Sequence, residues 1–414
     1  MKHVISLSYS DSVGGAARAA YRIHRALLEY GINSEIWATD VKLRDCTVKP
    51  IGSPGGSVIA KMKYVMGGAA VYAMKTSNKI IHSPAIIPSV LHKLINESDA
   101  DLIHLHWVNH DMMSIRDIAK ITKPVVWTLH DMWAFCGAEH VSYDFRWRDG
   151  YLTDNRPHEE GGIDLNRLVW ERKIKHWKRP MHIVTPSRWL AQCVKESKLM
   201  HEWPVTVVPN PIDTKAWVPL NKAEARSIFN IDPDVSLLLF GSADGIDAYH
   251  KGYDLLMKAL KILKDNFTGL QIIVFGQNPC KYDVECGFPV HYVGFLHDDE
   301  YLRIIYSAAD AMVIPSRKDN LPNMGNEALA CGTPVIAFDI CGLPDIVEHK
   351  KNGYLANAFD VEDLADGIRW TITDSERNRQ LSVNARRKAV ECFDYPVVAR
   401  QYAMVYQDVL NGSA

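Results

Sequence analysis

Cysteine is sparse and scattered in this sequence, and its pattern excludes two kinds of stabilised site. The eight cysteines among 414 residues form no CxxC pair, so neither a disulfide framework nor a zinc site is supported. An excess of one charge sign is also missing. The formal net charge is −2, which gives no general attraction to nucleic acid. We therefore expect no nucleic-acid partner, and any anion must be bound by a local site.

Long apolar runs are absent as well. No window reaches the roughly 18 apolar residues that span a bilayer. The nearest is residues 58–82, where an apolar centre at 64–74 is flanked on both sides by lysines. This segment fits either a surface element that meets anionic lipid or a helix packed on the core. The first residues lack the apolar stretch and cleavage site of a signal peptide, so we expect a cytoplasmic protein.

Short apolar runs alternate with longer amphipathic segments along the whole chain. "HVISLS" (3–8) precedes a helical pattern at 16–31, and "SLLLFGS" (236–242) precedes another at 252–267. Such alternation predicts parallel sheets with helices on both faces. Because two such sets occur, we predict an α/β fold of two doubly wound, Rossmann-like domains. Ligands are then expected at the carboxyl ends of strands and in the cleft between the domains.

The expected domain boundary lies within residues 205–226, where prolines and a turn follow a strand. We predict an N-terminal domain over residues 1–208 and a C-terminal domain over residues 209–394. The last helical pattern, in residues 395–414, is expected to pack back on the N-terminal domain.

A pair of glycines follows the first predicted strand. Gly14 and Gly15 would let the backbone approach an anion, and the start of the next helix supplies N–H groups. A plain tight turn is the alternative interpretation. The glycines do not form the G-x-G-x-x-G pattern, so an oxidoreductase loses its main support.

The motif "TLHDMW" (128–133) follows another buried strand. His130 stands where such sheets bind ligands, and it can donate a hydrogen bond to a substrate hydroxyl. Asp131 can orient this histidine or cap the next segment. Alternatively, His130 is a strand-end histidine whose partners are backbone groups.

Lys251 and Gly252 stand at the start of the predicted helix at 252–267. A lysine is unfavourable there because the helix dipole is positive at its N-terminus. A bound anion, of which phosphate is the obvious example, explains the charge better than a solvated lysine does.

Two carboxylates flank a turn in "SRKDNLPNMGNEALACGTPVIAF" (316–338). Asp319 precedes the turn, and Pro322 and Gly325 are expected to bend the chain. Glu327 is expected in the first turn of the following helix, where its charge suits the dipole. Two carboxylates so placed can hold separate parts of a polyhydroxylated ligand. Because both belong to one short segment, we expect them to bind rather than to hydrolyse a glycosidic bond.

Together these motifs resemble the retaining nucleotide-sugar glycosyltransferases of family four, which have the two-domain GT-B fold. The resemblance covers nearly the whole chain and is most specific in residues 307–355. It is carried by "VGGAARAA", "TLHDMW", "HKGYDLL" and "NEALACGTPVIAF". Within the family, the sequence looks most similar to enzymes that build bacterial exopolysaccharide, capsule or O-antigen. The resemblance implies transfer of a sugar from a GDP- or UDP-linked donor to a saccharide or lipid-linked acceptor, with no metal and no other cofactor.

The resemblance also implies roles for individual residues. Lys251 would meet the pyrophosphate, Glu327 would hold the ribose, and Asp319 would hold hydroxyls of the donor sugar. His130 would contact that sugar near the reaction centre, so the expected catalytic residues are His130, Asp319 and Lys251. The expected donor-binding residues are Gly14, Gly15, Lys251, Val293, Gly294, Asp319, Asn320, Leu321, Pro322, Asn323 and Glu327.

Two departures from the family pattern have consequences. Many members place an arginine before the lysine–glycine pair, and this loop has none, so His250 or a residue from elsewhere must share the phosphate charge. Some close relatives carry several cysteines after "TLHDMW", but here only Cys136 remains, so no metal is expected. Segment 134–180 either faces the acceptor, as Asp131 and Trp133 are expected to do, or is a packed surface loop.

Three other functions fit parts of this pattern. One is a sugar-nucleotide epimerase on the same fold, and another is a phosphorylase. The third is a non-catalytic protein that binds a sugar nucleotide, an interpretation supported by the missing arginine alone. A peripheral contact with anionic membrane is expected from the family and from segment 58–82.

Overall fold

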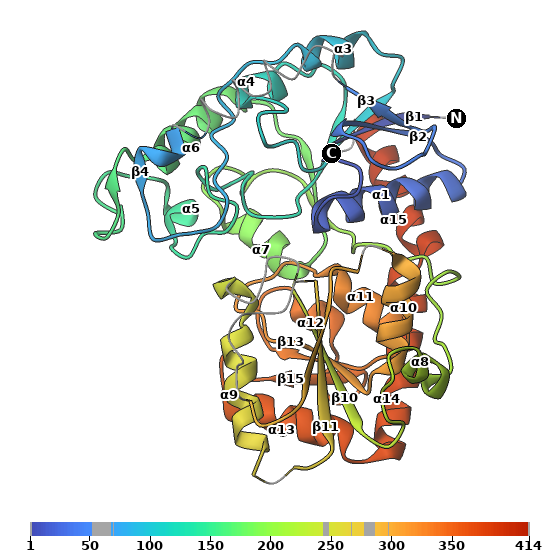
Figure 1. Cartoon of the computed structure of the whole chain (residues 1–414). Helices are drawn as coiled ribbons and strands as arrows, with labels where there is room; N and C mark the ends of the chain where they lie inside the picture. The colour runs from blue at the N-terminus through green and yellow to red at the C-terminus, as the bar shows by residue number, and fades with distance from the viewer. Residues whose placement is uncertain are drawn as a thin grey trace. The chain divides into compact units, whose positions relative to one another are not determined.

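The computed structural model describes residues 2–51, 68, 70–242, 248–265, 267–276, 286–296 and 298–412. The chain divides into two compact units, Met1–Val208 with Ala399–Ala414, and Pro209–Val398 (Figure 1). The last helix, α15 (Tyr395–Leu410), therefore begins in the second unit and ends in the first. Residues 64–67 and 69 of the apolar centre of segment 58–82 lie outside the described residues.

The first unit is built on a seven-stranded parallel sheet with the order β3-β2-β1-β5-β6-β8-β9. The chain runs outward from β1 through β2 to β3 and then returns to β5 on the other side of β1. Strands β1 and β5 therefore flank a topological switch point, where open α/β sheets bind ligands. The strands are β1 (His3–Ser10), β2 (Asn33–Asp40), β3 (Val48–Pro50), β5 (Leu102–Leu105), β6 (Val125–Thr128), β8 (His182–Thr185) and β9 (Val205–Val207).

Helices connect these strands. In α1 (Gly15–Glu29), the buried residues Ala19, Ile23 and Ala26 recur at helical spacing on one face, as the pattern at 16–31 predicts. The other helices of this unit are α3 (Leu91–Glu97), α4 (Ile115–Ile118), α5 (Arg146–Asp149), α6 (Leu165–His176) and α7 (Arg188–Glu196), and a small antiparallel pair is formed by β4 (Met74–Lys75) and β7 (Gly161–Gly162).

Segment 134–180 is packed into the first unit. Trp147 is 4% exposed and Trp177 is 5% exposed, and both belong to the main core cluster. The amine of Lys173 is fully buried and donates to the carbonyl oxygens of Trp133, Cys136 and Gly137. These contacts support the packed-loop interpretation of this segment.

The second unit contains a six-stranded parallel sheet with the order β12-β11-β10-β13-β14-β15. The chain moves outward from β10 to β12 and then returns to β13 on the other side of β10. Strands β10 and β13 thus flank the switch point of this sheet. The strands are β10 (Ser236–Gly241), β11 (Leu270–Phe275), β12 (Val290–Gly294), β13 (Ala311–Ile314), β14 (Val335–Phe338) and β15 (Gly353–Ala356).

Helices cover both faces of the second sheet, with α9 and α13 on one side and α8, α10, α11 and α14 on the other (Figure 1). Each face buries its own apolar cluster. This arrangement confirms the predicted α/β fold with two Rossmann-like domains. The helices are α8 (Lys222–Ile228), α9 (Tyr253–Leu263), α10 (Asp299–Ala308), α11 (Asn323–Ala330), α12 (Leu343–Ile346), α13 (Val361–Ile372) and α14 (Ser375–Lys388), with a 3₁₀ turn η1 (Tyr249–Lys251) and a π-helical turn η2 (Ala389–Phe393).

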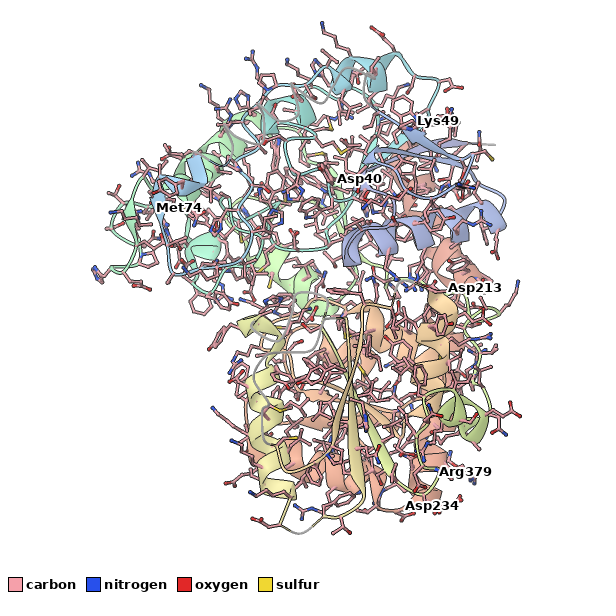
Figure 2. All side chains as sticks on the ribbon, in the orientation of Figure 1. Asp40, Lys49, Met74, Asp213, Asp234 and Arg379 are labelled. Atoms are coloured by element: carbon pink, nitrogen blue, oxygen red, sulfur yellow. The ribbon has the colours of Figure 1, made fainter. Side chains whose placement is uncertain are left out.

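Charged groups mark the open edge of the first sheet. Lys49 lies on the edge strand β3 (Figure 2), and its Nζ is 2.7 Å from Oε1 of Glu35 on β2. A lysine on an edge strand discourages pairing with another chain.

Among the described residues, no helix is long and apolar enough to cross a bilayer.

Candidate functional site

The switch point of the second unit brings Lys251 and Asp319 together. Lys251 ends the turn η1, which follows β10, and Asp319 lies in the segment after β13. Nζ of Lys251 is 2.9 Å from Oδ2 of Asp319, and Ser316 Oγ donates to the same oxygen at 3.2 Å. The side chains of Lys251 and Asp319 are 16% and 14% exposed, respectively. The charge of Lys251 is therefore met by a carboxylate in this structure.

Gly252 makes this pairing possible. It has φ of +71° and is the residue before α9. A Cβ at this position would lie 1.9 Å from the carbonyl oxygen of Pro315. Only glycine suits both the left-handed backbone and the close approach to the end of β13. The glycine of the lysine–glycine pair is thus a structural requirement of the turn that carries Lys251.

A pair of asparagines fixes the segment that follows Asp319. Asn210 donates through Nδ2 to the carbonyl oxygen of Leu321 at 3.1 Å and to Oδ1 of Asn323 at 3.2 Å. Asn326 donates back to the carbonyl oxygen of Asn210 at 2.9 Å. Pro322 lies between these anchors as the N-cap residue of α11. Asn210 comes from the segment after β9, far from its partners in the sequence. Its hydrogen bonds to Leu321 and Asn323 could therefore not be predicted from sequence spacing.

Glu327 lies in the second turn of α11, because it is the fifth residue of a helix that begins at Asn323. The expected place in the first turn is therefore wrong. Its carboxylate is largely buried, with the residue 4% exposed, and Oε2 accepts a hydrogen bond of 2.9 Å from the hydroxyl of Tyr306 on α10. Sequence reasoning missed Tyr306, which lies 21 positions earlier in the chain.

Gly325 does not bend the chain, contrary to expectation. It is the third residue of α11 and lies inside the helix. A Cβ at this position would lie 2.7 Å from Cδ1 of Ile346 and 3.3 Å from Cδ1 of Ile314. The glycine is needed because α11 packs closely against α12 and β13.

Arg317, which follows β13, contacts the turn that carries Lys251. Its guanidinium forms two hydrogen bonds of 2.7 Å with the carboxylate of Asp254 and donates to the carbonyl oxygen of Tyr249 at 2.9 Å. It also lies 4.1 Å from the centre of the Tyr249 ring, and its backbone N–H donates to the carbonyl oxygen of His250 at 2.8 Å. Arg317 therefore fastens the turn that carries Lys251 to the end of β13.

Val293 and Gly294 lie on the edge strand β12, and β11 separates this strand from β10. Gly294 has φ of +74°, and its carbonyl oxygen accepts a hydrogen bond of 2.8 Å from Gly276. Val293 packs against the core of the second unit. Their expected contact with a nucleobase stays a prediction.

Gly14 and Gly15 form the junction between β1 and α1 in the first unit. Gly14 is the N-cap residue with φ of +87°, and a Cβ there would meet nothing within 4 Å. The backbone conformation, not crowding, therefore requires glycine at this position. Gly15 is the first residue of α1. Their expected contact with phosphate stays a prediction.

His130 follows β6 in the first unit. Its Nε2 is 3.1 Å from Nδ1 of His106, which follows the neighbouring strand β5. Burial lowers the pKa of His130 to about 4, although Asp131 opposes the shift. The imidazole is therefore neutral near pH 7, and it can act as a hydrogen-bond donor or acceptor without carrying charge.

Asp131 is held by three hydrogen bonds. Its carboxylate lies 2.6 Å from Nδ1 of His140 and accepts from the indole of Trp107 at 2.9 Å and from the backbone of Trp133 at 2.9 Å. Burial alone would raise the pKa of Asp131, but His140 and these hydrogen bonds lower it. Asp131 thus ties together the segment after β6, and its expected contact with an acceptor stays a prediction.

Trp133 is a core residue. Its side chain is 2% exposed, and its indole N–H donates to the carbonyl oxygen of Ser83 at 2.9 Å. The amine of Lys173 lies 3.9 Å from the centre of the ring. This placement argues against the acceptor role expected of Trp133, because a buried ring offers no face to a ligand.

No group of three or more His, Cys, Asp or Glu side chains that could hold a metal ion occurs in the described part of the chain. Cys136 is buried and is a free thiol.

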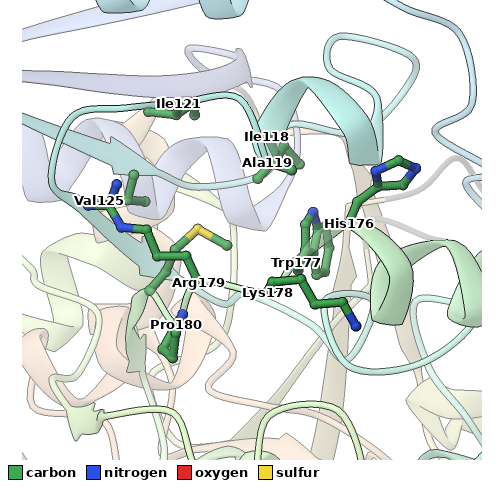
Figure 3. A pocket seen from close by; sticks show the side chains of 10 residues that line it. Ile118, Ala119, Ile121, Val125, His176, Trp177, Lys178, Arg179 and Pro180 are labelled. Carbon is green, nitrogen blue, oxygen red and sulfur yellow. The ribbon is translucent and has the colours of Figure 1, made fainter.

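A pocket of about 190 Å³ lies in the first unit, at the start of β6 and the end of α6 (Figure 3). It is lined by none of the expected site residues. Its apolar wall includes Ile121 and Trp177, while the basic side chains of His176, Lys178 and Arg179 also line it.

Two family models match the chain, one in each half. The model described as Glycosyltransferase Family 4 matches residues 13–216, and the model described as Glycosyl transferases group 1 matches residues 229–388. The two matches fall largely on the first and the second unit, respectively.

Curated relatives match only part of the chain. A sulfoquinovosyl transferase of Arabidopsis thaliana is 33% identical over 192 residues, which are 44% of this chain and 36% of that protein. An N-acetyl-alpha-D-glucosaminyl L-malate synthase of Bacillus anthracis is 30% identical over 117 residues, or 28% of this chain and 31% of that protein. The chain thus spans about a third of the length of these two relatives.

Solved structures match along the whole chain and agree on the fold. A sucrose-phosphate synthase from Thermosynechococcus elongatus has a TM-score of 0.69 at 18% identity, covering 100% of both chains. HepE from Anabaena, solved with UDP and glucose, has a TM-score of 0.63 at 15% identity, covering 98% of this chain and 100% of HepE. WaaG, a glycosyltransferase involved in lipopolysaccharide biosynthesis, has a TM-score of 0.63 at 18% identity, covering 99% of this chain and 100% of WaaG.

Proposed function

Because the chain carries family-four and group 1 glycosyltransferase domains on a GT-B fold, we propose that it transfers a sugar from a nucleoside-diphosphate donor to an acceptor hydroxyl. The donor is UDP- or GDP-linked, and the UDP bound to HepE favours UDP. The observation that carries the proposal is the 2.9 Å pair of Lys251 and Asp319 at the β10–β13 switch point. In this proposal the lysine binds the diphosphate, and the carboxylate beside it binds sugar hydroxyls.

The second unit supplies the donor-binding residues in this proposal. Lys251 neutralises the pyrophosphate, and Asp319 accepts hydrogen bonds from the sugar. Asn210 and Asn326 support the backbone of the segment between Asp319 and α11. Glu327, whose Oε2 accepts a hydrogen bond from Tyr306, is proposed to accept hydrogen bonds from the ribose hydroxyls.

The reaction breaks the bond between the anomeric carbon and the diphosphate oxygen and forms a bond between that carbon and the acceptor oxygen. The leaving diphosphate gains charge, which Lys251 and the positive ends of helix dipoles stabilise. The acceptor proton passes to the departing phosphate oxygen on the same face of the sugar. We infer that configuration is retained through an oxocarbenium-like transition state, with no obligatory divalent ion and no bound cofactor.

In the first unit, His130 is proposed to bind the donor sugar near the reaction centre. The lowered pKa keeps its imidazole neutral, so His130 contributes a hydrogen bond rather than a charge. Gly14 and Gly15 are proposed to lie near phosphate, because the backbone at a helix N-terminus attracts anions.

The test is release of nucleoside diphosphate from UDP-glucose, UDP-galactose, UDP-N-acetylglucosamine and GDP-mannose, with and without oligosaccharide acceptors. We expect one donor to be consumed faster when its acceptor is present, and Asp319→Asn to lower kcat/KM at least tenfold. Asp363→Asn is the matched control, because Asp363 also accepts hydrogen bonds but lies on α13. Donor binding without any turnover would instead favour a non-catalytic sugar-nucleotide-binding protein.

We further infer a role in bacterial surface polysaccharide synthesis, with a saccharide or lipid-linked acceptor. The structural likeness to WaaG is consistent with this role but is a likeness of fold. We also infer a contact with anionic membrane, made by basic side chains such as Lys178 and Arg179, which line the pocket of the first unit. Basic side chains near a surface attract anionic lipid.

Vesicle flotation tests the membrane contact. We expect the protein to float with phosphatidylglycerol vesicles at low salt and to stay unbound with phosphatidylcholine vesicles. The double variant Lys178→Glu, Arg179→Glu is expected to lose most of this binding. Equal flotation with both kinds of vesicle, or with neither, contradicts the inference.

A further inference from the structure

Three histidine rings lie next to one another in the first unit. His104 and His106 are two residues apart in the sequence, and the centres of their rings are 4.0 Å apart. The rings of His106 and His130 are inclined at 26° to one another, with centres 5.4 Å apart. His104 and His106 are at most 3% exposed.

Both nitrogens of His104 have partners. Nε2 is 2.7 Å from Oγ1 of Thr128, and Nδ1 is 2.7 Å from the hydroxyl of Tyr406 on α15. The hydroxyl of Tyr402 lies 3.0 Å from Oγ1 of the same threonine. His104 is thus fixed from both sides, and its ring gives His106 a rigid surface to pack against.

The two nitrogens of His106 have different surroundings. Nδ1 lies 3.1 Å from Nε2 of His130. Nε2 is buried and has no hydrogen-bond partner among the described residues. The backbone of His106 is held by the carbonyl oxygen of Leu7 at 2.9 Å and by the indole N–H of Trp127 at 3.1 Å, so the ring is attached to a fixed main chain.

Burial keeps both rings neutral, because it holds the pKa of His106 well below its usual range and lowers that of His130 to about 4. Each ring then carries one proton, and two arrangements allow the hydrogen bond between them. In the first, His106 donates from Nδ1 and keeps an unpaired lone pair on Nε2. In the second, His130 donates from Nε2 and His106 keeps a buried, unpaired N–H.

The first arrangement is favoured, because orphaned N–H groups in protein interiors are rarer than under-satisfied acceptors. We propose that His106 is a positioning residue whose Nδ1–H donates to Nε2 of His130 and thereby holds the proton of His130 on Nδ1. The catalytic meaning of this assignment rests on the function proposed above.

The assignment specifies what His130 can do. Its Nε2 lone pair is occupied by His106, so this nitrogen cannot take a proton from a substrate. Its Nδ1–H is a hydrogen-bond donor, suited to a hydroxyl oxygen of the donor sugar. His130 thus serves as a neutral donor of fixed orientation, and not as a general base.

Two variants of His106 test the hydrogen bond. His106→Asn keeps an N–H donor, because the asparagine amide nitrogen is separated from Cβ by as many bonds as Nδ1 of histidine. His106→Leu removes the donor and keeps apolar bulk. In steady-state transfer assays we expect the leucine variant to lose at least tenfold in kcat with little change in KM for the donor, and the asparagine variant to stay within about threefold of wild type.

Nitrogen NMR of the full-length protein labelled with ¹⁵N-histidine gives a readout that needs no activity. The His130 signals are assigned by their loss in His130→Gln. We expect a protonated Nδ1 and an unprotonated Nε2 on His130 in the wild type and in His106→Asn, and a mixture of tautomers in His106→Leu. A protonated Nε2 on His130 in the wild type overturns the proposal.

The two readouts separate this proposal from the proposed function. The expected tautomer in a protein without transferase activity would leave the assignment intact and reject the function. Transferase activity with equal losses in the asparagine and leucine variants would reject the hydrogen-bonding role of His106 and leave the function intact. Thermal unfolding of each variant identifies any loss that comes from misfolding.

Discussion

Removing the hydroxyl of Tyr306 is expected to lower both the stability of the second unit and its affinity for the donor nucleotide. The hydroxyl donates to Oε2 of Glu327 at 2.9 Å, and the two residues are 0% and 4% exposed. Tyr306→Phe leaves a carboxylate oxygen buried without this partner. A hydrogen bond to a charged group contributes about 1.5–3 kcal/mol, so we expect a loss of this size in the free energy of unfolding.

The same change is expected to weaken nucleotide binding about tenfold, because a difference of about 1.4 kcal/mol corresponds to that factor. Without the hydroxyl of Tyr306, the carboxylate of Glu327 loses a hydrogen bond that orients it for the proposed contact with the ribose. Urea denaturation measures the stability, and isothermal titration with UDP and GDP measures the affinity. Glu327→Gln and the double variant complete a cycle, and we expect the double variant to lose less than the sum of the single losses.

Tyr354→Phe is the matched control. The hydroxyl of Tyr354 donates to Oδ1 of Asp363 at 2.7 Å, but Tyr354 lies on the edge strand β15 and is only partly buried. We expect a smaller loss of stability and unchanged nucleotide affinity. If Tyr306→Phe matches the wild type in both urea midpoint and affinity, the role given to this hydrogen bond is refuted.

Three further predictions address other contacts. Arg317→Ala removes both hydrogen bonds to Asp254, which is half exposed, so we expect the free energy of unfolding to fall by at most about 1 kcal/mol. We expect the donor affinity measured by isothermal titration to fall several-fold. Arg317→Lys should give an intermediate affinity, because lysine cannot form the bidentate contact. Lys173→Met removes the donor to three buried carbonyl oxygens, and we expect urea denaturation to report a loss of about 3 kcal/mol. Burial lowers the pKa of His24 to about 4. Between about pH 6.5 and 4, this histidine is therefore protonated in the unfolded chain but neutral in the folded protein. Stability should therefore fall as pH drops from about 6.5 towards 4, by up to about 1.4 kcal/mol per pH unit for this residue, and His24→Gln should reduce that slope in urea midpoints measured across the range.

Each of these predictions has a contrary result. An unchanged donor affinity in Arg317→Ala would mean that the turn before α9 needs no fastening. A fully stable Lys173→Met would mean that the three carbonyl oxygens find other partners. An unchanged pH slope in His24→Gln would assign the acid sensitivity to other buried histidines.

The two parallel sheets with helices on both faces could be predicted from sequence because their signals are local. Each buried strand is a short apolar run bounded by turn residues, and each crossover helix shows its apolar face at regular spacing. Gly14 and Gly252 could be read in the same way, since a glycine between a strand and a helix marks a turn. Lys251 stood out because a cation at a helix start needs an explanation.

The partners of these residues could not be predicted, because topology decides them. Lys251 and Asp319 are 68 positions apart and meet because β10 and β13 are neighbours. Asn210 reaches its partners across more than 110 positions. No sequence periodicity links such residues, and the distance between them cannot be derived from the sequence before the fold is known.

Two local expectations failed for a different reason. Trp133 is expected from sequence to face the acceptor, but its ring is buried and its indole donates to the backbone of Ser83. Gly325 looked like a bend, but it serves close packing inside α11. In both cases tertiary packing decided the role of a residue whose local signal was ambiguous.

The most direct test of the central claim is a thermal-shift measurement of the wild type and Lys251→Ala with UDP, GDP and ADP. A ligand that binds only the folded state stabilises it by about 2.7 kcal/mol at a hundred times its Kd. We predict a clear rise in Tm with UDP or GDP that is strongly reduced in Lys251→Ala, although the variant itself remains folded. No shift with any nucleoside diphosphate, or an equal shift in the variant, would contradict the assignment of Lys251 to a nucleotide-sugar site.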